Sequence, residues 1–248
     1  MRSVLLALSV AVSAIVPTAQ ADETSNAPLI FVELFTSQGC SSCPPADAVL
    51  GELAERDDIA AVTLNVDYWD YLGWPDRLAK SEYTARQRAY QTSLGGWTIY
   101  TPQLVVQGRS GVVGSDRRRV ETALKENAGP AQVEVTLSRI GDEIVVDVAP
   151  TALGGDAAVA SATVWAFVYK DQITQPIGAG ENDGRTITYH NVAREMTVLG
   201  EWTPTSERRF ALTTPTDRDG VIVIVQEDRV SDVGPVIGVG KLTLSGDG

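Results

Sequence analysis

The chain has 248 residues, of which 44% are hydrophobic and 21% are charged, and its formal net charge is −12. This composition is that of an ordinary globular protein, and the length allows one large domain or two modest ones. The acidic balance argues against nucleic acid as a partner, because phosphate recognition needs clustered Lys and Arg.

The first residues have the layout of a secretory signal peptide. Arg2 supplies positive charge, residues 4–16 are almost wholly apolar, and Ala19-Gln20-Ala21 forms an Ala-x-Ala cleavage pattern. The apolar stretch is too short to span a bilayer comfortably, and no later segment approaches that length. We therefore expect a signal peptide over residues 1–21. The mature protein should be periplasmic or secreted, without a membrane span, where disulfides persist.

Residues 27–129 alternate short apolar runs with helical periodicity, as α/β domains do. The expected elements are, in chain order, a buried strand at 29–35, a helix at 46–56, a buried strand at 59–66, a helical stretch at 78–94, a hairpin of 103–107 with 111–114, and a helix from a cap at Ser115 or Asp116 to about Asn127.

The pattern changes after Gly129-Pro130, which stops the last of these helices. Strand-like runs follow at 133–137, 144–148, 162–169, 185–190, 208–213, 221–225 and 236–244. Short strands separated by Gly, Pro and Asp predict a β-sandwich or barrel. We therefore expect an α/β domain over 27–129 and an all-β, sandwich-like domain over 131–248.

The chain has two cysteines, Cys40 and Cys43, within the stretch GCSSCPP. They could form a redox pair, part of a metal site or a structural disulfide. Zinc needs four ligands, and the single histidine, His190, lies far along the chain in a strand-like run typical of a structural residue, so no metal is expected. A structural disulfide closing so short a loop would add little stability. A Cys-x-x-Cys between a strand and a helix favours redox chemistry.

In a redox pair, Cys40 is expected to attack and Cys43 to resolve. Cys40 precedes a helix that begins beside Pro44-Pro45. Free N–H groups and the positive end of the helix dipole at such a place stabilise a thiolate. Cys43 lies one turn further on, so we expect it to be more buried and to resolve a mixed disulfide formed at Cys40.

Two further residues are candidates for the same site. Pro102 begins a strand, and a cis Thr101-Pro102 bond would expose backbone groups to an incoming substrate strand. Glu33 is the only charged residue of its apolar run. If it is buried, its pKa would rise and it could exchange a proton with the resolving thiol. A strand-end carboxylate in water is an equal alternative.

Aromatic and acidic residues gather in the segment 67–100. The residues that could wall a substrate groove are Trp69, Trp74, Trp97 and Tyr100, together with Thr101. The alternative is that the aromatic side chains pack this segment onto the sheet. Asp67, Asp70 and Asp76 lack the spacing of a Ca²⁺ loop, and we expect them to be exposed loop acids.

The order of strand, Cys-x-x-Cys, helix, strand, insertion, Thr-Pro, hairpin and helix resembles the thioredoxin fold. The resemblance implies an attacking Cys40, a resolving Cys43, a cis-proline loop at Pro102 beside them, and a buried acid corresponding to Glu33. Thioredoxins carry an aromatic residue before the first cysteine and Gly-Pro between the two, whereas this chain has Gly39 and Ser41-Ser42. The intervening dipeptide tunes the reduction potential, so the direction of electron flow stays open.

Longer motifs resemble a family of exported bacterial proteins classed as a domain of unknown function. They are VELFTSQGCSSCPPAD (32–47), LNVDYWDYLGWPD (64–76), TARQRAY (84–90), YTPQLVVQGR (100–109), VGSDR (113–117) and, more loosely, GENDGRTITYHNV (180–192). This resemblance bears on the fold and the site and names no substrate.

The sequence thus predicts an exported thiol–disulfide oxidoreductase that works through a mixed disulfide at Cys40. Its partners would be a protein or peptide thiol or disulfide and a separate redox partner. No organic cofactor or nucleotide is expected, because neither a GxGxxG after a strand nor a P-loop is present. The alternatives are a secreted binding module whose disulfide is structural, and a periplasmic protein that binds copper through the thiols.

Overall fold

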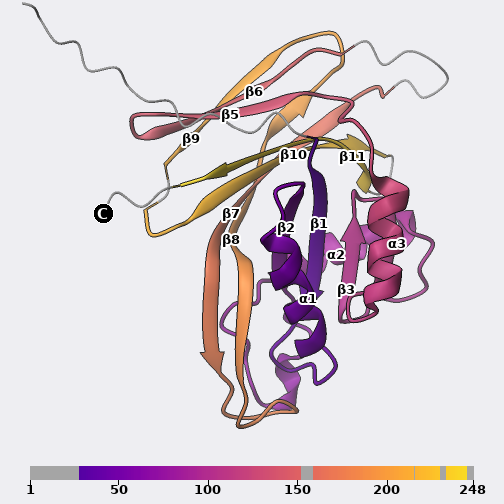
Figure 1. The fold of residues 1–248 in the computed structure, drawn as a ribbon, viewed down its shortest axis with the longest axis vertical. Coiled ribbons are helices and arrows are strands. Elements are labelled where there is room, and N and C mark those ends of the chain that lie inside the picture. Colours follow the sequence, from indigo (N-terminus) through magenta and orange to yellow (C-terminus); the bar gives the residue numbers. More distant parts are fainter. Residues whose placement is uncertain (1–27, 152–158, 215, 230–232, 245–248) are drawn as a thin grey trace, which may run out of the picture.

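The computed structural model describes residues 28–151, 159–214, 216–229 and 233–244. The predicted signal peptide, residues 1–21, lies outside them. The described residues form a mixed α/β structure with a large mixed sheet of eight strands and a smaller antiparallel sheet of three (Figure 1). No helix within these ranges has the length and apolar character needed to cross a membrane.

The first half of the chain has the elements expected from the sequence. They are β1 (Ile30–Thr36), α1 (Pro44–Ala54), β2 (Ile59–Asn65), the 3-10 turn η1 (Asp70–Leu72), α2 (Ser81–Ser93), β3 (Gln103–Val106), β4 (Ser110–Val113) and α3 (Arg117–Asn127). Asp116, one of the two expected caps, accepts a hydrogen bond from the Arg119 N–H at 3.1 Å and so fixes the start of α3.

The second half consists of strands, and two of them are much longer than predicted. The strands are β5 (Val135–Ile140), β6 (Glu143–Val148), β7 (Ala162–Pro176), β8 (Thr186–Trp202), β9 (Arg208–Thr213), β10 (Gly220–Asp228) and β11 (Val233–Thr243). β7 has 15 residues and β8 has 17. Their extensions are mixed polar and apolar and gave no strand signal, but they pair with each other along the hairpin, which satisfies their backbone groups.

The eight strands run in the order β11-β10-β7-β8-β2-β1-β3-β4. β8 joins β2 through the parallel pair Thr63↔Val192. The Thr63 hydroxyl also donates to the His190 carbonyl at 2.6 Å, and the Asn191 amide donates to the Ala61 carbonyl at 3.0 Å. Strands from both sides of Gly129-Pro130 therefore share one sheet. The domain boundary expected there stays a prediction.

The small sheet β5-β6-β9 packs against β7, β10 and β11 of the large sheet through a core of Val, Ile, Leu and Trp side chains. Glycine in β11 permits this close approach. A Cβ at Gly240 would lie 2.4 Å from Leu137 Cδ1 and 2.9 Å from the Val135 carbonyl oxygen. This part of the molecule thus has the face-to-face packing of two sheets.

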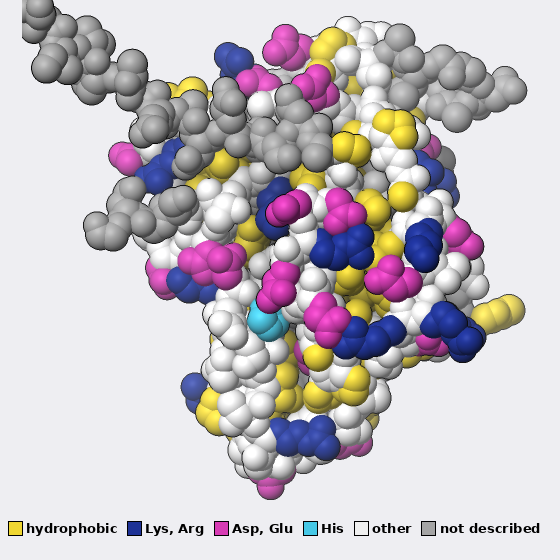
Figure 2. Space-filling model, viewed as in Figure 1, with side chains coloured by type: hydrophobic (Ala, Val, Ile, Leu, Met, Phe, Trp, Pro, Cys, Tyr) yellow, Lys and Arg dark blue, Asp and Glu magenta, His cyan; other side chains and the backbone are white. Residues whose placement is uncertain are grey.

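The strand β1 is covered on both faces, which explains its uninterrupted apolar sequence. Val32 and Leu34 point to the side of α1 and α3, whereas Phe31 and Phe35 point to the side of α2. Figure 1 shows α1 and α3 on the near face of the sheet and α2 behind it. Over the near face, acidic and basic side chains are interspersed (Figure 2).

Glu33 lies on the α2 face of β1 and is fully buried, which is one of the two alternatives for this residue. It forms an ion pair with Arg86 of α2, and the Tyr90 hydroxyl donates to its Oε2 at 2.5 Å. Arg86 also donates from Nη2 to Gln226 Oε1 of β10 at 3.1 Å. This buried network ties α2 to β1 and to β10, so both halves of the chain depend on it.

Arg86→Met should lower the free energy of unfolding by about 3–5 kcal/mol, because it leaves the Glu33 charge buried without its partner. Urea denaturation followed by circular dichroism measures the loss. The double variant Glu33→Gln/Arg86→Met should recover part of it.

Arg117→Met is the matched control, since Arg117 pairs with Glu52 at an exposed position and its loss should change stability little. Equal losses in Arg86→Met and Arg117→Met would contradict this account of the core.

Candidate functional site

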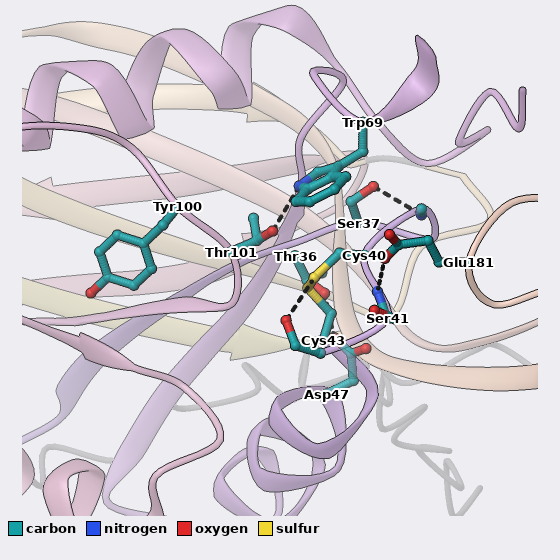
Figure 3. The surroundings of a disulfide bond; sticks show 12 residues. Thr36, Ser37, Cys40, Ser41, Cys43, Asp47, Trp69, Tyr100, Thr101 and Glu181 are labelled. Atoms are coloured by element: carbon teal, nitrogen blue, oxygen red, sulfur yellow. Dashed lines mark hydrogen bonds between the residues drawn. A yellow bond between two sulfur atoms is a disulfide. The ribbon is translucent and has the colours of Figure 1, made fainter. Parts of the chain in front are cut away.

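Cys40 and Cys43 form a disulfide in the connection from β1 to α1, with their Cα atoms 5.4 Å apart (Figure 3). Cys43 is the N-cap of α1, and Pro44 and Pro45 are the first residues of the helix. Proline is tolerated there because N–H groups of the first turn have no acceptor within the helix. Both cysteines are buried, Cys40 with 1% and Cys43 with 0% of its surface exposed. A thiol that attacks Cys40 therefore needs a covering group to move.

The backbone N–H groups around the disulfide are mostly engaged. The N–H of Cys43 donates to the Cys40 carbonyl at 3.2 Å, and those of Ala46 and Asp47 donate to the Cys43 carbonyl. Pro44 and Pro45 have no N–H to give. The structure therefore lacks most of the free helix N–H groups that the sequence led us to expect as stabilisers of a Cys40 thiolate.

Asp47 lies one helical turn after Cys43 and is 2% exposed. Figure 3 shows it below the disulfide. Its Oδ1 accepts a hydrogen bond from the Thr36 hydroxyl at 2.7 Å. Burial raises the pKa of Asp47 to about 8, the Thr36 hydrogen bond opposes the rise, and the charge of Asp76 adds to it. Near neutral pH this carboxyl can give and take a proton.

Glu33, the acid that the sequence suggested for this role, is not brought to the cysteines. It lies on the α2 face of β1, whereas Thr36 and Asp47 lie on the α1 face. Sequence reasoning missed Asp47. The available signal was its spacing, because an acid four residues after Cys43 falls on the same helical face as the cysteine.

Asp76 is buried, with 5% of its surface exposed, so the expectation of an exposed loop acid is wrong for this residue. Its carboxylate accepts hydrogen bonds from the N–H groups of Gln38 and Leu78 and from the Asn65 amide, at 2.8–2.9 Å. Burial raises the pKa of Asp76 against the effect of these bonds. The residue anchors the cysteine loop to the end of β2.

Tyr189 of β8 completes a buried polar group with Asp47 and Asp76. Its side chain is fully buried. Burial raises the pKa of Tyr189, and the charges of Asp47 and Asp76 raise it further. Asp47, Asp76 and Tyr189 are therefore three buried titratable side chains whose charges influence one another.

The connection from β7 to β8, residues 177–185, reaches across the chain to the cysteine loop. Glu181 Oε2 accepts a hydrogen bond from the Ser41 N–H at 3.1 Å. The buried Asn182 donates from Nδ2 to the carbonyls of Gln38 and Cys40, at 2.9 Å each. We call residues 177–185 the hairpin tip. Neither Glu181 nor Asn182 was a predicted site residue, although both lie in the loosely matching motif of 180–192.

Two of the expected groove residues lie beside the disulfide. The Thr101-Pro102 peptide bond is cis, and the Trp69 indole N–H donates to the Thr101 hydroxyl at 2.8 Å (Figure 3). Trp69 also explains Gly39. A Cβ at Gly39 would lie 3.0 Å from the Trp69 Cβ, so this loop has no room for a side chain before Cys40.

The remaining predicted residues lie in different places. The Trp74 indole N–H donates to Gln38 Oε1 at 2.7 Å, and its ring packs on Gly178 of the hairpin tip. Trp97 is 99% exposed. The Tyr100 ring points away from the disulfide in Figure 3. The structure therefore brings Trp69, Trp74 and Thr101 to the cysteine loop and leaves Trp97 and Tyr100 outside it.

His190 is not brought to the sulfur atoms. Its ring packs on Gly51 of α1, where a Cβ would lie 2.7 Å from the ring Cδ2, and Gly51 is two turns beyond Cys43. The ring lines an open groove with Pro44 and Ala48 and is visible in cyan in Figure 2. A copper site that combined this ring with the two cysteines would need the ring at the sulfur atoms, whereas the copper alternative that uses the thiols alone stays a prediction.

Comparison with known proteins gives a family and a fold. A family model described as "Protein of unknown function (DUF1223)" matches residues 31–226. The crystal structure of a protein from Agrobacterium tumefaciens is similar, with 30% identity, a TM-score of 0.75, and coverage of 90% of this chain and 97% of its own. HBP35 of Porphyromonas gingivalis shares the fold at 15% identity, with a TM-score of 0.56 and coverage of 89% and 76%. No curated protein matches the sequence.

Asp47 should make the fold less stable as the pH rises from about 4 to about 8. The folded chain keeps its proton up to about pH 8, whereas the unfolded chain releases it at about the ordinary value of 3.8. Between these values the folded state binds more protons, so the free energy of unfolding falls by up to about 1.4 kcal/mol per pH unit. Asp47→Asn should remove this slope. Urea denaturation of both proteins between pH 4 and 9 tests the claim, and parallel stability curves would refute it.

Proposed function

The chain belongs to the DUF1223 family of proteins of unknown function, and we propose that it is an exported thiol–disulfide oxidoreductase with a thioredoxin-like core. The observation that carries the proposal is a buried carboxyl one helical turn from a Cys-x-x-Cys disulfide, with its pKa raised by burial to about 8. A disulfide that only staples a loop needs no such group, whereas perturbed carboxyls concentrate at functional sites.

The arrangement of the first half supports the thioredoxin-like assignment. β2, β1, β3 and β4 are neighbours in that order, β1 and β2 are parallel, and β3 is antiparallel to β1. The disulfide precedes α1, and the cis Thr101-Pro102 bond precedes β3, so both lie at the same end of the central strands. The predicted signal peptide supports export, and protein disulfides form and persist outside the cytoplasm.

The exchange would run through Cys40. A substrate thiolate attacks Cys40 Sγ, a mixed disulfide forms, and the sulfur of Cys43 leaves as a thiolate. Protonated Asp47 gives this thiolate its proton. In the reverse step, Asp47 takes the proton from Cys43, whose thiolate attacks Cys40 Sγ and displaces the substrate sulfur as a thiolate. Thr36 holds the Asp47 carboxyl in place through its 2.7 Å hydrogen bond.

A secreted binding module with a static disulfide is the second candidate. The observation in its favour is the burial of both cysteines, because exchange requires access to Cys40. In the redox proposal, Trp69 or the hairpin tip moves to admit the attacking thiol. The two candidates therefore differ in two respects: whether a mild reductant such as glutathione reduces the Cys40–Cys43 disulfide, and whether Cys40 forms a mixed disulfide.

Cys43→Ser, reduced and then mixed with oxidised glutathione, should form a mixed disulfide at Cys40 that mass spectrometry detects, because its resolving thiol is missing. Cys40→Ser is the control and should form an adduct at Cys43 at least about tenfold more slowly, since Cys43 is the resolving thiol.

The wild-type protein should become reduced in a graded glutathione buffer. A pair that stays oxidised well below about −300 mV, the range of structural disulfides, together with no adduct on Cys43→Ser, would favour the binding module instead.

A further inference from the structure

We infer that Glu181 makes the Cys40–Cys43 pair an electron donor. Its carboxylate accepts the hydrogen bond of the Ser41 N–H, which lies between the two cysteines, and its charge disfavours a thiolate on Cys40. The inference rests on the proposed function and adds the direction in which the site works. Its substrates would be protein disulfides, which the reduced pair would reduce.

The Ser41 N–H is the geometric basis of this inference. A thiolate at the start of a helix is stabilised by backbone N–H groups that follow the cysteine. Here the Ser41 N–H donates to Glu181 Oε2 at 3.1 Å instead. This hydrogen bond lowers the pKa of Glu181, so the side chain carries its negative charge at neutral pH. The Ser41 N–H is therefore engaged by a carboxylate, and a negative charge lies against the backbone between the two cysteines.

The position of Glu181 is fixed by its neighbour. Asn182 is fully buried and bonds to the carbonyls of Gln38 and Cys40. Trp74 packs on Gly178, where a Cβ would lie 3.1 Å from the ring. The hairpin tip is thus held to the cysteine loop on both sides of Glu181, although the Glu181 side chain itself is exposed.

Other charged and polar groups also surround the pair. Asp47 from α1 and Asp76 from the segment after β2 are both acidic, and burial raises the pKa of each. Arg185 is a cation of the hairpin tip, and its Nη1 donates to Asn182 Oδ1 at 3.1 Å. The Ser42 hydroxyl, 3.4 Å from Cys40 Sγ, is a donor that favours the thiolate. Glu181 and Ser42 therefore act on Cys40 in opposite directions.

The direction of electron flow follows from this balance. Stabilising the reduced form makes a pair a strong oxidant, and disfavouring its thiolate does the reverse. In the donating direction, the Cys40 thiolate attacks a substrate disulfide, a mixed disulfide forms, and one substrate sulfur leaves and is protonated. The Cys43 thiolate then attacks Cys40 Sγ and releases the second substrate thiol. Two electrons pass to the substrate, and a dithiol protein must re-reduce the pair.

The first test is the pKa of Cys40 in the Cys43→Ser background, measured from the pH dependence of its alkylation by iodoacetamide. Adding Glu181→Gln should lower this pKa by about one unit, which is about a tenfold gain in thiolate at a fixed pH below it. Adding Ser42→Ala should raise it. Asp183→Asn is the matched control, because it removes the same charge from an exposed residue of the hairpin tip two positions away. High salt should shrink the Glu181 effect.

The second test is the thiol–disulfide equilibrium of the otherwise wild-type protein with glutathione at pH 8. Glu181→Gln should shift it towards the dithiol by up to about tenfold, or about 30 mV. An unchanged Cys40 pKa in Glu181→Gln, or an equal change in Asp183→Asn, would overturn the role of Glu181 even when Cys43→Ser still forms its glutathione adduct. Loss of that adduct in every variant would instead overturn the proposed function. Circular dichroism confirms that each variant is folded.

Discussion

The pairing of β8 with β2 is the constraint on which the rest of the site depends. A parallel bridge, Thr63↔Val192, joins strands from the two halves of the chain in one sheet, and side-chain bonds from Thr63 and Asn191 reinforce it. Because β7 and β8 then run as one long hairpin beside the first half, their tip arrives at the cysteine loop. The surroundings of the disulfide are therefore built from residues 140 positions apart.

Two buried acids on opposite faces of the central sheet have different surroundings and different consequences. Glu33 has a guanidinium and a phenol as partners, so its charge is compensated and the network fastens α2 to the sheet. Asp47 has the Thr36 hydroxyl as a partner and a second acid, Asp76, nearby. Burial therefore raises its pKa, and the carboxyl keeps its proton. A compensated charge is useful for assembly, whereas a carboxyl that titrates near neutral pH is useful for chemistry.

The sequence was sufficient to predict the elements whose formation depends on neighbouring residues. The β1 run, the Pro44-Pro45 start of α1, the hairpin at 108–110 and the Asp116 cap each depend on neighbouring residues, and each element is present. The long extensions of β7 and β8 were missed because partner strands, rather than an apolar run, stabilise them. For the same reason Glu181 and Asn182 were missed, and Asp76 was mistaken for an exposed acid. Their roles depend on contacts with residues far away in the chain.

The dipeptide between the cysteines illustrates how a short motif depends on the whole fold. Its residue types alone leave the reduction potential open, since serine offers both a backbone N–H and a hydroxyl. The fold separates these donors, for Ser41 gives its N–H to Glu181 of the hairpin tip and Ser42 points its hydroxyl at Cys40 Sγ. In a chain without the long hairpin, the Ser41 N–H would lose the carboxylate that accepts its hydrogen bond. The surroundings of this Cys-x-x-Cys thus depend on the contact between its loop and the hairpin tip.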